Sequence, residues 1–142
     1  MLQFWDLGGQ REIRGLWDKY YNESSAVCFI IDSTATERLE ECWTVFGPSL
    51  IPSRHLRQNK GINILRFTET VLADRRVKGV PVLVLANKQD AEGSIPVEEI
   101  KQMFNKLIEG KLNVSEGAVM PISALNGSVD RTLHATSLLI EL

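Results

Sequence analysis

The sequence predicts an α/β domain in which helices flank a mostly parallel β-sheet. The main observation is an apolar run at residues 80–86 that does not alternate with polar side chains. Such a run is typical of a strand buried on both faces, as in parallel sheets. The apolar stretch at residues 26–31 predicts a second buried strand and that at 119–122 a short one, and segments with helical spacing lie between the three. A chain of 142 residues is expected to form one domain.

Composition narrows the classes of function. A net charge of −2 gives no polyelectrolyte signature, so we expect no nucleic-acid partner. Cys28 and Cys42, without a signal peptide, indicate reduced thiols in the cytoplasm. His55 and His134 lie in unrelated contexts and indicate no metal site. No apolar stretch approaches the roughly 20 residues of a membrane span, and Leu2 stands where N-myristoylation requires glycine.

The chain opens on a predicted strand at residues 2–5, followed by Asp6-Leu7-Gly8-Gly9-Gln10. Globular chains rarely begin in mid-strand, so we expect a missing segment upstream. After a strand, an aspartate can hold a water on Mg²⁺, and a glycine amide can approach a terminal phosphate because no Cβ intervenes. Gln10 could orient an attacking water. Alone, the glycine pair would be an ordinary turn.

Residues 11–21 are charged and aromatic, with apolar side chains at helical spacing. Core packing is the simple interpretation and is expected for Leu16. Gly15 costs about 1 kcal/mol of helix stability relative to alanine, which suits an element that rearranges. Large aromatic side chains on so short an element also suit a face that binds a partner.

The strand at residues 26–31 leads to a predicted helix. Thr34 and Glu37 form a potential capping box at its start. The apolar stripe of this helix consists of Leu39, Cys42, Trp43 and Phe46.

Residues 47–68 interrupt this helical pattern and keep no period of their own. If they are removed, Phe46 joins Glu69 and the apolar stripe resumes in phase at Val71 and Leu72. We therefore expect an insertion within one helix, such as a retained intron translated in frame, because structureless loops of this length are uncommon in compact domains. The alternative is a real loop that contacts a membrane or phosphate, since it holds four Lys or Arg and no acid.

The apolar run at 80–86 ends at Asn87-Lys88-Gln89-Asp90. Polar groups at the carboxyl end of such a strand lie where open α/β sheets bind ligands. The Asp90 carboxylate can accept from a ring N–H and an exocyclic amine on guanine, and adenine offers no matching pair of donors. The Lys88 stem can cover the base, and Asn87 can brace the loop. A polar turn that merely closes a strand remains the alternative.

The C-terminal third predicts a helix and a strand. Pro96, with Glu98 and Glu99 in the first turn, marks the start of a helix. Its predicted buried face is Val97, Ile100, Phe104, Leu107 and Ile108. The strand at 119–122 leads to Ser123-Ala124-Leu125, whose backbone amides could meet a base carbonyl. A further helix is expected from residue 128.

Together these motifs resemble the last three nucleotide-binding motifs of small GTPases, and most closely those of the ADP-ribosylation factor (Arf) family, in its Arf-like and Arf-related branch. The motifs are Trp5-Asp6-Leu7-Gly8-Gly9-Gln10, Leu16-Trp17 with Tyr20-Tyr21, and Asn87-Lys88-Gln89-Asp90. The resemblance covers residues 2–46 and 69–127 and is weak beyond them. It implies a Ras-like G domain, which is a P-loop NTPase fold, and three loops that converge on one purine nucleotide at the carboxyl edge of the sheet.

The resemblance also implies roles for individual residues. Asp6 would hold Mg²⁺ through water, Gly9 would donate to the γ-phosphate of GTP, and Gln10 would position the hydrolytic water. The residues expected to bind the guanine base are Asn87, Lys88, Asp90, Ser123 and Ala124. The expected effector surface is Trp5, Trp17 and Tyr20. Family members cycle between GDP and GTP with exchange factors, GTPase-activating proteins and effectors. They act in vesicle traffic at Golgi and related membranes as cytoplasmic or peripheral proteins.

The chain departs from the family pattern because it contains no Gly-x-x-x-x-Gly-Lys-[Ser/Thr]. The family's phosphate loop, first switch, first two strands and amphipathic membrane anchor would all precede Met1. Lost phosphate contacts, at roughly 1.5–3 kcal/mol each, are large beside the roughly 12 kcal/mol of nanomolar binding. We therefore expect a G domain whose nucleotide affinity is millimolar or weaker and whose chain is marginally stable and prone to aggregation. A nucleotide-independent module that binds effectors is the alternative.

Overall fold

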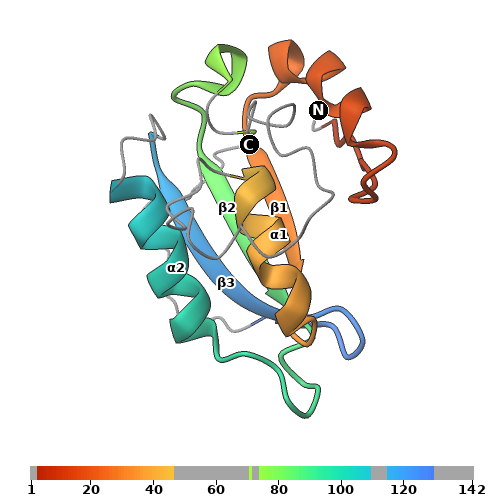
Figure 1. Cartoon of the computed structure of the whole chain (residues 1–142), viewed down its shortest axis with the longest axis vertical. Coiled ribbons are helices and arrows are strands. Elements are labelled where there is room, and N and C mark those ends of the chain that lie inside the picture. The colour runs from red at the N-terminus through yellow and green to blue at the C-terminus, as the bar shows by residue number, and fades with distance from the viewer. Residues whose placement is uncertain (1–2, 47–70, 72–73, 110–114, 130–142) are drawn as a thin grey trace, which may run out of the picture.

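The computed structural model of the protein describes residues 3–46, 71, 74–109 and 115–129. Four strands form one sheet in the order β1-β2-β3-β4, with bounds β1 (Val27–Asp32), β2 (Val82–Asn87), β3 (Gly117–Ser123) and β4 (Ser128–Val129). The first three strands are parallel, and β4 is antiparallel to β3. Figure 1 shows β1, β2 and β3 ending at the same edge of the sheet. The predicted α/β class with a mostly parallel sheet is confirmed.

Strand register sets which side chains meet at this edge. Asp32 at the end of β1 pairs with Asn87 at the end of β2, and Ala86 pairs with Pro121 of β3. Neighbouring strands lie about 4.8 Å apart. The residues that follow each strand are therefore brought within side-chain reach of one another, although they are far apart in the sequence.

Two helices pack on one face of the sheet: α1 (Thr36–Phe46) and α2 (Val97–Glu109). Every second side chain of β2 enters the core between sheet and helices, where Val82, Val84 and Ala86 are fully buried. The core cluster consists of Ile31, Leu39, Trp43, Val82, Val84, Ala86, Ile100, Phe104 and Val119. The alternate residues of β2 are only partly buried, so the described part of the chain covers the two faces of the sheet unequally.

The edge strand β1 differs from its prediction. The expected strand exists, but Cys28 is exposed and Ile30 is 62% exposed, so the prediction that this strand is buried is wrong for one of its faces. The physical reason is its position. Within the described residues β1 pairs only with β2, and the helices α1 and α2 cover only the face of Ile31.

The helix α2 forms as predicted. Glu98 and Glu99 occupy its first turn, where acidic side chains favour the helix dipole. Ile100 and Phe104 are 0% and 1% exposed. Phe104 lies so close to the start of β3 that a Cβ on Gly117 would stand 2.9 Å from its ring. The side chains of α1 are described in part: Leu39 and Trp43 are buried as expected, whereas the side chain of Phe46 lies outside the description.

The N-terminal segment does not form the predicted strand. Residues 3–10 have no strand, and Phe4 is 83% exposed. Two short 3₁₀ helices follow, η1 (Arg14–Lys19) and η2 (Tyr21–Glu23). Leu16 is 47% exposed, so its predicted core role is also wrong. A strand requires a neighbour that satisfies its backbone groups, and no described strand pairs with residues 3–10.

Several expectations fall outside the described residues. The proposed insertion at 47–68 is one of them, and so are residues 130–142 of the expected C-terminal helix. Residues 128 and 129, which were expected to begin that helix, form β4 instead. Val71, which is expected to continue the stripe of α1, is described and buried. Where the chain is described, no helix has the length and apolar character of a membrane span.

Candidate functional site

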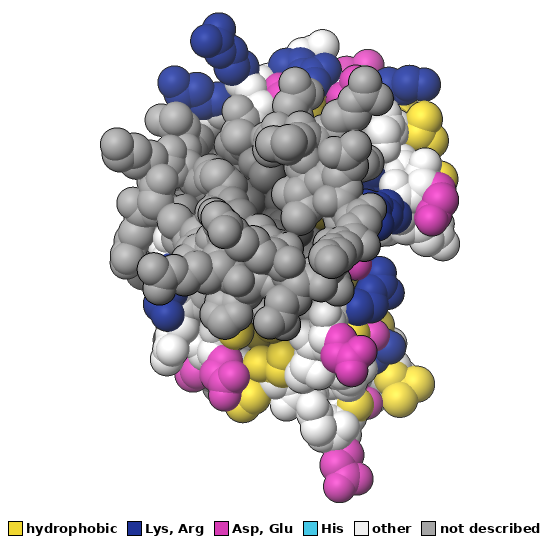
Figure 2. Space-filling model, in the orientation of Figure 1, with side chains coloured by type: hydrophobic (Ala, Val, Ile, Leu, Met, Phe, Trp, Pro, Cys, Tyr) yellow, Lys and Arg dark blue, Asp and Glu magenta, His cyan; other side chains and the backbone are white. Residues whose placement is uncertain are grey.

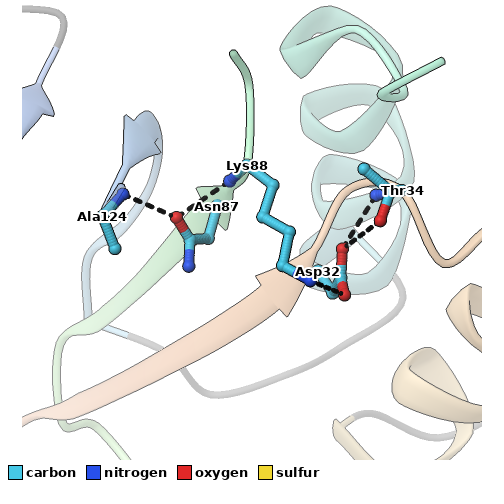
Figure 3. A network of polar contacts seen from close by, with 5 residues as sticks. All are labelled: Asp32, Thr34, Asn87, Lys88 and Ala124. Atoms are coloured by element: carbon cyan, nitrogen blue, oxygen red, sulfur yellow. Dashed lines mark hydrogen bonds and ion pairs between the residues drawn. The ribbon is translucent and has the colours of Figure 1, made fainter. Parts of the chain in front are cut away.

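The carboxyl edge of the sheet brings together polar side chains from the ends of β1 and β2 and a backbone amide that follows β3 (Figure 3). Asn87 ends β2, and its Oδ1 accepts from the backbone N–H of Lys88 at 2.8 Å and of Ala124 at 3.0 Å. The predicted bracing role of Asn87 is confirmed, because this one oxygen ties the β2 loop to the loop after β3. The side-chain nitrogen of Asn87 points away from both amides (Figure 3).

Lys88 has an unusual backbone conformation, and its side chain reaches the end of β1. It is the one described non-glycine residue with a positive φ, +66°, a conformation that side chains other than glycine adopt rarely. Its Nζ lies 2.7 Å from Oδ2 of Asp32. The other oxygen of Asp32 accepts from the backbone N–H of Thr34 at 3.0 Å and from its hydroxyl at 2.7 Å. Asp32 therefore links the ends of β1 and β2.

This arrangement corrects the predicted capping box. The Thr34 hydroxyl donates to Asp32, and α1 begins at Thr36, two residues later. Asparagine, aspartate, serine and threonine readily form such local turns in place of a cap. In this turn Thr34 orients the carboxylate of Asp32 through two hydrogen bonds. The capping pattern does not suggest this role.

Electrostatics favour the charged form of Asp32. The hydrogen bond from Lys88 is the main cause, and with those from Thr34 it lowers the pKa of Asp32 from 3.8 to about 2. The side chains of Asp32 and Lys88 are 39% and 53% exposed, so solvent screens the pair substantially. The pair positions the lysine more than it stabilises the fold.

Gln89 points in the opposite direction, into the protein. Its Nε2 donates to Oγ of Ser33 at 2.7 Å and to the carbonyl of Ile95 at 3.0 Å. Ser33 is fully buried, and its backbone N–H donates to the carbonyl of Asn87 at 3.0 Å. Asp32, Ser33 and Gln89 were not predicted as site residues. The signal was available, because Asp32-Ser33-Thr34 follows a predicted strand at the same edge.

Asp90 is the exposed member of the loop. Its carboxylate makes no hydrogen bond with the rest of the described chain. A cavity of about 300 Å³ lies between this loop and the turn after β3, and it is lined by Gln89, Asp90, Pro121, Ile122, Asn126 and Ser128. This volume is at the lower end of the range for small-molecule sites. Ser123 is buried beneath the turn, and its Oγ accepts from the backbone N–H of Asn126 at 3.4 Å.

The predicted phosphate-side residues, Asp6, Gly9 and Gln10, lie elsewhere. Figure 1 shows the N-terminal segment beside α1, towards the end of the sheet where β1 begins. Arg14 holds it there, since its Nε donates to the Gly9 carbonyl at 2.9 Å and its guanidinium pairs with Glu41 of α1 at 2.9 Å. The expectation that this motif converges with Asn87-Lys88-Gln89-Asp90 is therefore not met in this structure. Without a strand at residues 3–6, nothing carries the motif to the carboxyl edge.

The predicted effector residues lie together on the N-terminal segment. The rings of Trp5 and Tyr20 are 4.9 Å apart, and Nε1 of Trp17 donates to the Gly8 carbonyl at 3.0 Å. Trp5 remains 46% exposed. These three aromatic side chains, with Phe4 and Leu16, are here named the aromatic surface.

A second arginine fixes the opposite side of this segment. The 3₁₀ helix η6 (Arg75–Val77) precedes β2, and Arg76 within it forms a bidentate pair with Asp74. The same guanidinium donates to the carbonyl of Asp18 at 2.9 Å and lies 5.1 Å from the ring centroid of Tyr21. Arg76 therefore clasps η1 and η2 against the chain that leads into β2.

The described residues contain no cluster of three or more His, Cys, Asp or Glu that could hold a metal ion. The N-terminal segment, which carries Asp6, the predicted Mg²⁺ partner, lies apart from the carboxyl edge (Figure 1). The arrangement therefore suits recognition of a base at that edge, whereas the groups expected to hold Mg²⁺ and phosphate are not assembled beside it.

Comparison with known proteins agrees with the motifs. The ADP-ribosylation factor family model matches residues 1–65 and 65–135. The chain is 37% identical over 127 residues to ADP-ribosylation factor-like protein 3 of Saccharomyces cerevisiae, covering 89% of this chain and 52% of that protein. It is 39% identical over 126 residues to ADP-ribosylation factor-related protein 1 of Homo sapiens, covering 89% and 51%. The same-named protein of Rattus norvegicus is 41% identical over 104 residues, covering 73% and 41%.

The chain spans about half the length of the curated relatives it matches. The matched residues nevertheless include most of this chain and all of the motifs described above. The α/β sheet with its helices agrees with the fold of a Ras-like G domain. The chain therefore belongs to the ADP-ribosylation factor family.

Proposed function

We propose that the carboxyl edge of the sheet binds the base of a guanine nucleotide, and that the protein acts as an Arf-type GDP/GTP switch. The observation that carries the proposal is the bracing of Asn87 by two backbone amides. Because the side-chain oxygen of Asn87 accepts from these two amides, its side-chain nitrogen is left to donate to a ring acceptor of the guanine base. Exchange factors, GTPase-activating proteins and effectors in vesicle traffic, at Golgi membranes, are the partners that family membership supports.

The remaining residues of the loop complement guanine. Asp90 offers an exposed carboxylate, and guanine presents a ring N–H and an exocyclic amine on one edge. A carboxylate that accepts both would make two charge-assisted hydrogen bonds. The Lys88 stem, tethered through Nζ to Asp32, supplies an apolar surface against which a planar base can stack.

Hydrolysis is proposed on family membership alone. For Gln10 to position water, and for Asp6 and Gly9 to approach Mg²⁺ and phosphate, residues 6–10 must lie at the carboxyl edge. In the described arrangement they lie beside α1, held by Arg14. Beside α1, residues 6–10 do not assemble a Mg²⁺–phosphate site, so we derive no step of hydrolysis through them.

The test is binding of fluorescent GDP and GTP in the presence of Mg²⁺. Asp90→Ala should abolish binding. The matched control is Glu92→Ala, which removes an exposed carboxylate two residues further along the same loop and should leave binding unchanged. Binding that is equal in both variants, or absent in the wild type, contradicts the proposal.

A second candidate function is a nucleotide-independent module that binds effectors. The aromatic surface favours it, because Phe4, Trp5 and Leu16 are 83%, 46% and 47% exposed. Large apolar side chains that stay exposed on one segment are typical of sites that bind proteins. Capture of an Arf effector by nucleotide-free protein, abolished by Trp5→Ala and unaffected by Asp90→Ala, would support this function over the switch.

A further inference from the structure

Gln89 lies between the two charged members of the loop and forms a closed set of hydrogen bonds with the chain on its other side. Its side-chain nitrogen donates to Oγ of Ser33 and to the carbonyl of Ile95. The backbone N–H of Ile95 in turn donates to the carbonyl of Ser33 at 2.9 Å. Both protons of the amide are therefore used, and the three residues form a clasp that we name the Gln89 clasp.

The Gln89 clasp connects the loop after β2 to three other elements of the fold. Ser33 follows β1, and Ile95 lies two residues before α2. The backbone N–H of Gln89 also donates to the carbonyl of Ile122 in β3 at 3.2 Å. Gln89 thus fixes the loop after β2 to β1, to the start of α2 and to β3. Because Ser33 is fully buried, its hydroxyl has a restricted position and defines the geometry well.

Asp90 follows Gln89 in the chain and is the loop residue whose side chain is left free of polar contacts with the described residues. Asn87 is committed to the turn after β3, and Lys88 is committed to Asp32. The Asp90 carboxylate makes no hydrogen bond with any described residue, and its backbone follows directly from Gln89. The backbone of Asp90 is therefore placed by the anchored Gln89 before it and by the turn in which the N–H of Ala91 donates to the carbonyl of Lys88 at 3.0 Å.

We propose that Gln89 is a positioning residue that determines how strictly the site recognises the exocyclic amine of guanine. The inference rests on the proposed nucleotide binding and assigns a role to the loop residue whose side-chain nitrogen is committed to Ser33 and Ile95. Two hydrogen bonds from one carboxylate require its plane to match the base edge. A loosened Asp90 can still accept from the ring N–H, but it loses the second, geometrically demanding bond to the amine.

The test compares GDP with inosine diphosphate, whose base keeps the ring N–H and lacks the exocyclic amine. Titration calorimetry with Mg²⁺ gives the ratio of the two dissociation constants. Gln89→Met has a similar volume and no donors, so it opens the clasp without leaving a cavity. Loss of a net hydrogen bond to a charged group corresponds to about tenfold in affinity. We therefore expect the ratio of the inosine to the guanosine constant to fall about tenfold.

Two further variants make the test specific. Gln102→Met is the matched control, because Gln102 is exposed on α2, and it should leave the ratio unchanged. Ser33→Ala removes one of the two acceptors and should lower the ratio by a smaller factor. Combined with Gln89→Met it should add little, because the two changes break the same clasp.

The ratio separates positioning from a general loss of stability. If Gln89 served only the fold, Gln89→Met would weaken both nucleotides equally, and an unchanged ratio would overturn the inference while leaving the proposed function intact. If the wild type binds neither nucleotide, the proposed function fails and the inference fails with it. Amide hydrogen exchange without nucleotide gives a second measurement. The inference requires faster exchange at residues 89–95 in Gln89→Met, and unchanged exchange there would overturn it.

Discussion

The two ends of the molecule are stabilised in different ways. At the carboxyl edge, hydrogen bonds join β1, β2, β3 and the start of α2, and Ser33 and Ser123 are buried within the network. Residues 3–23 contain no buried side chain. They are held by contacts at the surface, chiefly those of Arg14 and Arg76. Figure 2 shows Lys and Arg side chains gathered at this end, whereas Asp and Glu prevail among the visible charges at the other.

This difference in burial and hydrogen bonding indicates which part of the proposed switch is rigid and which part costs little free energy to move. Short 3₁₀ helices have poor hydrogen-bond geometry, and residues 3–23 bury no side chain of their own. Local opening is cheapest where few apolar contacts are buried. The edge with Asn87 and Asp90 is therefore expected to keep its geometry, while the segment with Gly9 and Gln10 can be displaced at small cost.

The largest expected effect comes from an aromatic substitution in each region. Phe104→Ala removes a ring that is 1% exposed and packs on β3, and we expect it to lower the free energy of unfolding by about 3–5 kcal/mol. Phe4→Ala removes a ring that is 83% exposed, and a change within about 0.5 kcal/mol is expected. Chemical denaturation measures both. Equal losses would show that the N-terminal segment is packed as firmly as the core.

The brace at Asn87 should have an intermediate effect. Asn87→Ala leaves the backbone N–H groups of Lys88 and Ala124 without their acceptor, and we expect a loss of about 1–2 kcal/mol of unfolding free energy. Asn87→Asp keeps an acceptor oxygen at the same place and should retain most of the stability. Hydrogen exchange at Ala124 should accelerate in the alanine variant alone. If both variants exchange alike, the brace is not what orders the turn.

Substitution of Arg76 should act locally. Arg76→Ala removes the donor to Asp18 and the cation above Tyr21, so exchange at residues 17–23 should accelerate while the global unfolding midpoint stays unchanged. Arg75→Ala removes the neighbouring, exposed arginine and serves as the control. Tryptophan fluorescence gives a second signal, because Trp5 and Trp17 lie on the released segment. A shifted midpoint with unchanged local exchange would contradict the clasping role.

The regions also differ in how far the sequence predicts them. The strand at 82–87 and the helix from 97 follow from local patterns, an apolar run and an acidic first turn after Pro96. These elements were predicted correctly because they bury their own apolar residues in the core. The strand expected at 2–5 failed because strand formation depends on a partner, and no local pattern supplies one.

The site was predictable in part for the same reason. Asn87, Lys88 and Asp90 are adjacent in the sequence, so a short motif identifies them. The sequence places Asp32 and Ser33 at the end of a predicted strand, but their partners depend on the register that sets β1 beside β2, and no local pattern gives that register. The predicted convergence of Gly9 with Asp90 failed because it required a strand that the described chain does not form.

The smallest expected effect is the pH dependence of the pair between Asp32 and Lys88. Its hydrogen bonds, first from Lys88 and then from Thr34, lower the pKa of Asp32 from 3.8 to about 2. In the unfolded chain the carboxylate regains its ordinary pKa, so the folded state binds this proton less readily. The contribution of this pair to the free energy of unfolding is complete above pH 3.8, and it is lost as the pH falls from 3.8 to about 2. It does not change between pH 5 and 8.

Carbon NMR of the Asp32 carboxyl group should therefore show a titration midpoint near 2, and Lys88→Met should return it towards 3.8. Because both side chains are more than one-third exposed, 0.5 M NaCl should weaken the shift. A midpoint near 3.8 in the wild type at low salt would mean that the ammonium of Lys88 does not rest on Asp32. The lysine stem would then lack its tether, and its position over a base would have to be set by the nucleotide itself.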